Sequence, residues 1–117
     1  MSVLYVDAIK EQVTTSDSTA YTAPTASNFE SAHIIYGNCT NVGGSDAELT
    51  VNIVQYGETV ATTNEYLPPK VIFSGRYDSV TPLIGATLKA GDFISVKSSL
   101  ASSLNLKLSI KEIYTDT

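Results

Sequence analysis

The chain has 117 residues, of which only 16% are charged, and its formal net charge is −5. This length corresponds to one ordinary domain, so we expect residues 1–117 to form a single β-rich unit rather than two. The negative charge argues against binding to nucleic acid or to anionic membranes, because both require clustered Lys and Arg.

The residue types favour strands over helices. Val, Ile and Thr together account for 33 of the 117 residues, and these β-branched side chains prefer extended backbone. The first residues carry no basic segment followed by a long apolar run, so we expect no signal peptide. No stretch approaches the ~20 apolar residues of a transmembrane helix.

The first half of the chain predicts strands at 3–14, 29–40 and 47–56. The first of these has apolar residues on both faces, which suggests burial on both sides or a subunit contact. The segment NVGGSD separates the other two and favours a tight turn, so they are expected to form a β-hairpin. Residues 14–28 are rich in Ser, Thr and Ala, and we expect a loop or extended arm anchored by Tyr21.

The second half predicts a short edge strand at 59–66, which Pro68-Pro69 would prevent from pairing regularly. Further strands are expected at 70–77, 93–98 and 104–114, and the last alternates most regularly. A tight turn is predicted from Leu88 to Asp92. Gly91 can adopt positive φ there, and Asp92 can bond the backbone two residues on, so both are structural turn residues.

Seven or eight short strands with turns roughly every 8–12 residues predict an all-β fold. We expect a two-sheet antiparallel β-sandwich, jelly-roll-like in its connections, rather than a closed barrel, because the strands are short and the turns uneven in length.

Catalytic, cofactor and metal motifs are missing from the sequence, so we expect neither an enzyme nor a bound cofactor. His33 is the only histidine and is expected to be an ordinary solvent or interface residue. Cys39, the only cysteine, would share its strand face but lie roughly 20 Å away, too far for a common metal ion. We expect Cys39 to be buried as a small apolar residue. Asp46 and Glu48 could face together, but a solvated rim is the expected setting.

The layout of residues 79–96 (SVTPLIGATLKAGDFISV) and 104–113 (LNLKLSIKEI) combines an apolar segment, an L-x-x-G-D turn, and a final alternating strand. Together with the YTAP segment at 21–24 and residues 32–54, this layout resembles small virion proteins of tailed bacteriophages. The resemblance implies a β-sandwich or jelly-roll unit that acts as a capsid cement or decoration protein, or as a head–tail neck or tail component. It also implies a location in the virion, assembled in the host cytoplasm.

The partners that the resemblance implies are the major capsid protein or other virion proteins, with further copies of the chain itself. Tyr is enriched at protein interfaces, so the candidate interface residues are Tyr5, Tyr21, Tyr56, Tyr66 and Tyr77, although ordinary cross-strand packing would also explain them. A carbohydrate-binding module or a tumour-necrosis-factor-like ligand domain stays open as an alternative. The lack of Trp and of a calcium loop weighs against it.

Overall fold

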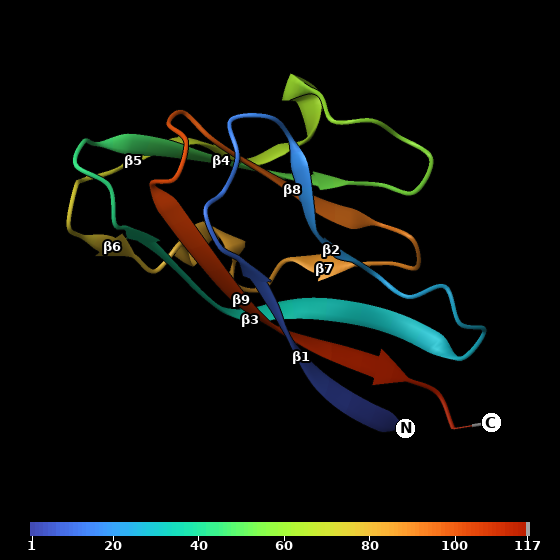
Figure 1. The fold of residues 1–117 in the computed structure, drawn as a ribbon. Coiled ribbons are helices and arrows are strands. Elements are labelled where there is room, and N and C mark those ends of the chain that lie inside the picture. The colour runs from blue at the N-terminus through green and yellow to red at the C-terminus, as the bar shows by residue number, and fades with distance from the viewer. Residues whose placement is uncertain (117) are drawn as a thin grey trace.

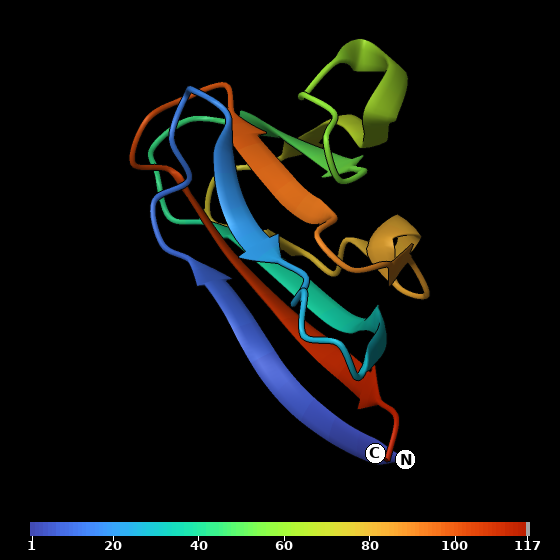
Figure 2. The ribbon, with the colours of Figure 1, turned by 90° about the vertical axis from the view of Figure 1, so that its right-hand side faces the viewer.

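The chain folds into two antiparallel β-sheets that pack face to face (Figures 1 and 2). The computed structural model describes residues 1–116. The strands are β1 (Ser2–Lys10), β2 (Ser18–Thr22), β3 (Phe29–Asn41), β4 (Ala47–Val54), β5 (Glu65–Ile72), β6 (Tyr77–Asp78), β7 (Thr87–Leu88), β8 (Phe93–Ser98) and β9 (Leu104–Tyr114). Two short 3-10 helices are η1 (Thr62–Asn64) and η2 (Thr81–Leu83). Over residues 1–116, no helix is long and apolar enough to cross a membrane.

The strand order is that of a jelly roll. One sheet has the order β1-β9-β3-β6, with β7 also pairing β3, and the other has the order β2-β8-β4-β5. β6 and β7 flank η2 and pair with opposite ends of β3, so together they act as one interrupted strand. The chain can thus be traced as one long hairpin whose tip is the connection between β4 and β5. Its strand pairs are β4–β5, β3 with β6 and β7, β2–β8 and β1–β9, and they lie alternately in the two sheets. This wrapping confirms the predicted all-β, two-sheet sandwich.

The core lies between the sheets and is built by simple alternation. In β9, Leu106, Leu108 and Ile110 are fully buried, whereas the intervening Lys107 is exposed. The opposite sheet supplies further fully buried aliphatic side chains, namely Leu49, Val51, Ile94 and Val96. Burying one such side chain is worth about 1.5–3 kcal/mol, so these paired faces dominate the stability of the sandwich.

The predicted hairpin over residues 29–56 is wrong. β3 pairs with β9, β6 and β7, whereas β4 pairs with β8 and β5. The connection at residues 42–46 therefore crosses from one sheet to the other, and the apolar faces of β3 and β4 face each other across the core. Strands packed face to face alternate with the same period as strands paired side by side, so the pattern alone does not separate the two arrangements.

Residues 14–28 are not simply a loop or arm, because they contain β2. This strand pairs with β8 and has a bulge between Thr19 and Tyr21. Its pairing continues past the strand, where the Ala23 N–H donates to the Asp92 carbonyl at 2.8 Å. The segment has too few apolar residues to show the alternation of a strand, which is why its composition indicated a loop.

The edge strand near the prolines is β5 and not residues 59–66. Pro68 and Pro69 lie inside β5, where its pairing with β4 shifts register between Leu49 and Val51. An edge strand with a bulge tolerates residues that lack an N–H donor. The prolines therefore interrupt the hydrogen-bonding ladder without ending the strand.

A bulge in β3 separates His33 from Cys39. The pairing with β9 shifts between Ile34 and Tyr36, so one extra residue is inserted. Residues six apart then lie on opposite faces, and the expectation that His33 and Cys39 share a face is wrong. Cys39 points into the core and is fully buried, as expected for a small apolar residue.

Candidate assembly surfaces

The turn at Gly91 and Asp92 links the connection between β7 and β8 to the connection that follows β4. The Asp92 N–H donates to the Lys89 carbonyl at 3.0 Å, and Gly91 has φ +81°, which together make a type II turn. The Asp92 carboxylate accepts from the Lys89 N–H at 2.8 Å and from the Tyr56 N–H at 3.0 Å. Asp92 thus bonds an earlier residue of its own turn and a residue of another connection. The predicted bond to the backbone two residues further along the chain is not the one that it makes. A Cβ on Gly91 would lie 2.9 Å from Tyr56 Cγ.

The five candidate interface tyrosines lie on five separate parts of the chain. Tyr5 is on β1, Tyr66 on β5 and Tyr77 on β6, and all three are exposed. Tyr56 follows β4 and is also exposed, whereas Tyr21 on β2 is half-buried. The five tyrosines therefore come from elements of both sheets.

Tyr21 belongs to a buried polar cluster around Glu112. The Glu112 side chain is only 4% exposed. Its carboxylate accepts a hydrogen bond from the Tyr21 hydroxyl and another, at 2.8 Å, from the Tyr114 hydroxyl. Burial, reinforced by Glu112, raises the pKa of Tyr21, and the hydrogen bond to Glu112 raises the pKa of Tyr114. This cluster ties β2 of one sheet to β9 of the other.

Sequence reasoning missed the Glu112 cluster, although a signal for it was present. Glu112 continues the even-numbered series of Leu108 and Ile110, all of which point into the sandwich. A carboxylate in that register requires hydrogen-bond donors.

Four connections gather at the end of the molecule opposite the chain termini (Figure 1). They join β1 to β2, β3 to β4, β5 to β6, and β8 to β9. Three of them expose large apolar side chains: Val42 is 60% exposed, Phe73 58% and Leu100 40%. We call these three residues the loop platform. Contiguous exposed apolar patches mark contact sites, so these three residues are the candidate contact surface at this end.

The connections around the loop platform are held together by Asn41, which is 1% exposed. Its amide donates to the Ile72 carbonyl at 2.8 Å and to the Ser45 carbonyl at 3.0 Å, and it accepts from the Gly43 N–H at 2.9 Å. The Val42 N–H donates to the Ser103 carbonyl at 2.8 Å. A surface ordered before binding loses less conformational entropy when it binds.

The other polar residues singled out in the sequence make local hydrogen bonds or are buried. The His33 ring bonds the hydroxyls of Ser31 at 2.9 Å and Thr87 at 3.1 Å. Among residues 1–116, no group of three His, Cys, Asp or Glu is placed to hold a metal ion. Asp46 accepts from the Ser74 N–H at 2.9 Å and so serves the loop end. Burial raises the pKa of the Cys39 thiol to about 12, which makes it unreactive.

No protein-family model matches the chain, and no curated protein matches it significantly. Solved structures do match it. A chain from the acid-stable capsid of Helicobacter pylori bacteriophage KHP30 is similar with a TM-score of 0.58 and 10% identity, over 100% of this chain and 95% of that one. A chain from the capsid of Ralstonia phage GP4 is similar with a TM-score of 0.54 and 11% identity, over 99% and 86%.

A third similar structure comes from Bacillus endospore appendages, described as a family of disulfide-linked pili. Its TM-score is 0.57 at 9% identity, over 98% of this chain and 90% of that one. At these identities the likeness is one of fold. The fold of this chain therefore resembles that of capsid and pilus proteins.

Proposed function

We propose that the chain is a structural protein of a phage virion, and that it acts as a capsid cement or decoration protein. The main support is the jelly-roll fold, which is similar over nearly its whole length to chains from two phage capsids. Those chains are little longer than this one, because it covers 95% and 86% of them. The layout of residues 79–113, which resembles small phage virion proteins, points to the same setting.

In this proposal the loop platform is the surface that binds the shell. Phe73 and Val42 are exposed apolar side chains on a hydrogen-bonded scaffold, and buried aromatic groups often dominate binding energy. Copies that bind across neighbouring shell subunits stabilise the assembled shell over its free subunits by mass action. Many weak contacts repeated over one particle then give a strong combined effect. No catalytic step is involved.

A filament subunit is the second candidate, because the fold also resembles that of a pilus protein. The cysteine content argues against the disulfide-linked kind. Cys39 is the only cysteine in the chain, so each copy could form one disulfide, which links two copies but cannot continue a filament. Cys39 is also fully buried.

The experiment compares phage particles made with and without this chain. Purified protein is added to particles lacking it, and bound protein is measured after sedimentation of the particles. We expect the wild type to bind in many copies and to raise the temperature at which the particles release their DNA. Phe73→Asp and Val42→Asp should each weaken binding at least tenfold, since they place a charge in an apolar contact.

Ile84→Asp is the matched control, because Ile84 is 43% exposed but lies outside the loop platform. Wild-type protein that fails to bind the particles would refute the cement role. Saturation at six or twelve copies would instead favour the neck or tail alternative.

A further inference from the structure

β1 differs from the other edge strands of the sandwich. β2 has five residues and a bulge, β5 contains Pro68-Pro69 at a register shift, and β6 and β7 have two residues each. All nine residues of β1 pair with β9 without any shift. Proteins usually protect edge strands with bulges, prolines or short length. Within the described residues, β1 is the only long and regular edge that has none of these devices.

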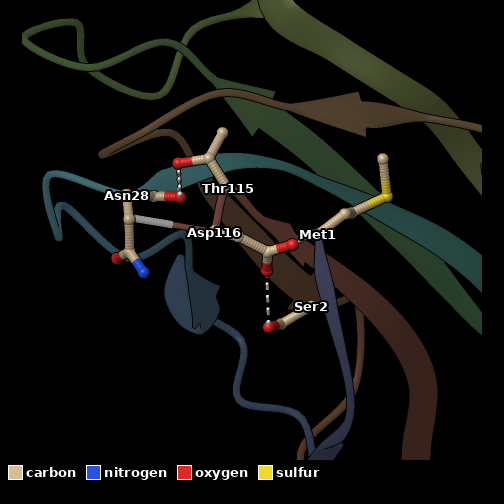
Figure 3. Close-up of polar contacts among 5 residues, drawn as sticks. All are labelled: Met1, Ser2, Asn28, Thr115 and Asp116. Carbon is tan, nitrogen blue, oxygen red and sulfur yellow. Dashed lines mark hydrogen bonds and ion pairs between the residues drawn. The ribbon is translucent and has the colours of Figure 1, made fainter.

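β1 is held by its pairing with β9 along all nine residues, and side-chain contacts add to this at two places. At its start, the Met1 amine pairs with the Asp116 carboxylate, and the Ser2 hydroxyl donates to it at 3.4 Å (Figure 3). In its middle, Asp7 accepts from the Ser109 hydroxyl at 3.1 Å. The free edge is therefore a fixed strand rather than a fraying end.

Most of the exposed side chains of β1 are apolar, and Ser2 and Asp7 are the exposed polar ones. Val3, Tyr5 and Ile9 point away from the core and are 42%, 66% and 57% exposed. Leu4 points toward the core but is still 51% exposed, since this end of the strand extends past the facing sheet (Figure 2). In the same view β1 is the outermost strand on its side of the molecule. A free edge with apolar side chains is suited to strand addition.

We propose that the partner of this edge is a second copy of the chain, whose β1 adds antiparallel across a two-fold axis at Val6. In this register Val3 of one copy faces Ile9 of the other, and Leu4 faces Ala8. The two five-stranded sheets then become one continuous sheet. A two-fold contact of this kind needs one self-complementary surface, and β1 is such a surface.

Neighbouring registers are less favourable. An axis at Asp7 would place the two Asp7 carboxylates opposite each other, and like charges directly opposite are destabilising. An axis at Tyr5 would place Val3 opposite Asp7. The axis at Val6 instead places Asp7 opposite Tyr5, whose hydroxyl gives it a polar end, and pairs the aliphatic residues with one another.

The charges at the ends of β1 favour the same register. The axis at Val6 places Lys10 of one copy opposite Ser2 of the other. The Ser2 hydroxyl contacts the Asp116 carboxylate (Figure 3), so each Lys10 ammonium shares that carboxylate with the Met1 amine of the other copy. This pairing occurs twice in the dimer because the axis repeats it.

The test is sedimentation equilibrium of the wild-type protein and four variants over a range of concentrations. One pair of strands makes a small interface, so we expect a dimer with a dissociation constant on the order of micromolar. Val3→Lys or Ile9→Glu alone should weaken the dimer about tenfold or more, because each introduces a charge opposite an apolar residue twice.

The variant that combines Val3→Lys with Ile9→Glu should regain most of the lost affinity. In the proposed register each introduced lysine faces the introduced glutamate of the other copy. Within one copy the two positions are roughly 20 Å apart, so they cannot compensate each other there. Ile84→Lys is the control and should leave the dimer unchanged. Ile84 is similarly exposed and lies between η2 and β7, near the edge of the sheet that is opposite to β1.

Circular dichroism of each variant checks that the fold is kept. A wild-type protein that is monomeric up to about millimolar concentration would overturn the proposal. A dimer that is indifferent to Val3→Lys and Ile9→Glu would do the same, as would a double variant that stays as weak as the single ones. This test needs no phage particle, so its result is independent of the proposed function.

Discussion

Asn41, Asp92 and Glu112 are polar residues that hold parts of the sandwich together from within. Asn41 joins the connections at the loop end, Asp92 joins the β7–β8 turn to the end of β4, and Glu112 joins the two sheets. Asn41 and Glu112 are almost fully buried. A buried polar group destabilises the fold unless it is hydrogen-bonded. The residues around each of these three side chains must therefore supply hydrogen-bond partners.

Substitutions at three glycines distinguish the two reasons why position 91 requires glycine, namely its positive φ and the close Tyr56 ring. Gly44→Ala should be nearly neutral, because a Cβ there meets no atom within 4 Å. Gly57→Ala should cost about 1–2 kcal/mol, because its φ of +85° disfavours an L side chain. Gly91→Ala should cost more than Gly57→Ala, because it adds a clash with the Tyr56 ring. Urea unfolding measures all three, and equal losses at Gly57 and Gly91 would contradict the clash.

Replacing Asn41 tests the scaffold of the loop platform. Asn41→Ala leaves the Ile72 carbonyl buried without its donor, so we expect a loss of about 2–3 kcal/mol in the free energy of unfolding. Asn38→Ala is the matched control on the same strand, where the side chain bonds only Thr40 at 3.4 Å. It should cost below about 1 kcal/mol. A comparable loss in both variants would mean that Asn41 has no special role.

The Tyr21 hydroxyl makes stability depend on alkaline pH. An unfolded tyrosine ionises near pH 10, whereas the raised pKa of Tyr21 keeps it protonated in the folded state. Above pH 10 the unfolded state therefore holds fewer protons, and the free energy of unfolding falls as pH rises. Because Tyr21 exchanges a single proton, its share of this slope is at most about 1.4 kcal/mol per pH unit.

We expect Tyr21→Phe to reduce the fall in stability between pH 10 and 11.5, roughly the range in which unfolded tyrosines ionise. Tyr77→Phe, which removes a hydroxyl far from Glu112, should keep the wild-type dependence. Comparing slopes rather than absolute stabilities isolates the contribution of the Tyr21 hydroxyl. Identical slopes for wild type and Tyr21→Phe would refute the assignment.

At the scale of elements, the strands with strong alternation were predictable. Strands β8 and β9 have the bounds 93–98 and 104–114 that the sequence predicts. β2 was missed because its five residues are mostly small and polar. The pairing of β3 with β9 was not predictable from local pattern, because the two strands are far apart in the chain and bulges alter their register.

The candidate site was less predictable than the fold. Tyrosine content indicated five interface residues, yet their positions depend on which sheet and which face each strand takes. The loop platform escaped prediction because Val42, Phe73 and Leu100 come from three separate connections. Their proximity follows only from the jelly-roll wrapping.

The prolines of β5 provide a test at the element scale. Replacing Pro68 and Pro69 together by Thr restores two N–H donors to this edge strand. We expect stability to change little but association on mild heating to increase, because the edge becomes able to pair with other chains. Light scattering measures this association. Pro24→Thr, outside any strand, is the control, and equal association in both variants would contradict the protective role.

At the scale of the whole molecule, the two proposed contact regions lie at different places on the jelly roll. The loop platform lies at the end opposite the chain termini, whereas β1 begins at the termini and runs along a sheet edge (Figure 1). A subunit of this shape could bind a shell through one region and a second copy through the other. Separate regions allow both contacts to form at once, which multiplies modest affinities.

The measurement that tests this account most directly is a cryo-EM reconstruction of the phage particle whose genome encodes the chain. We expect density for this jelly roll on the outside of the shell, with the loop platform against the shell. The copies should be related by symmetry and number on the order of hundreds. A particle in which the chain is absent from the shell, neck and tail would contradict the account.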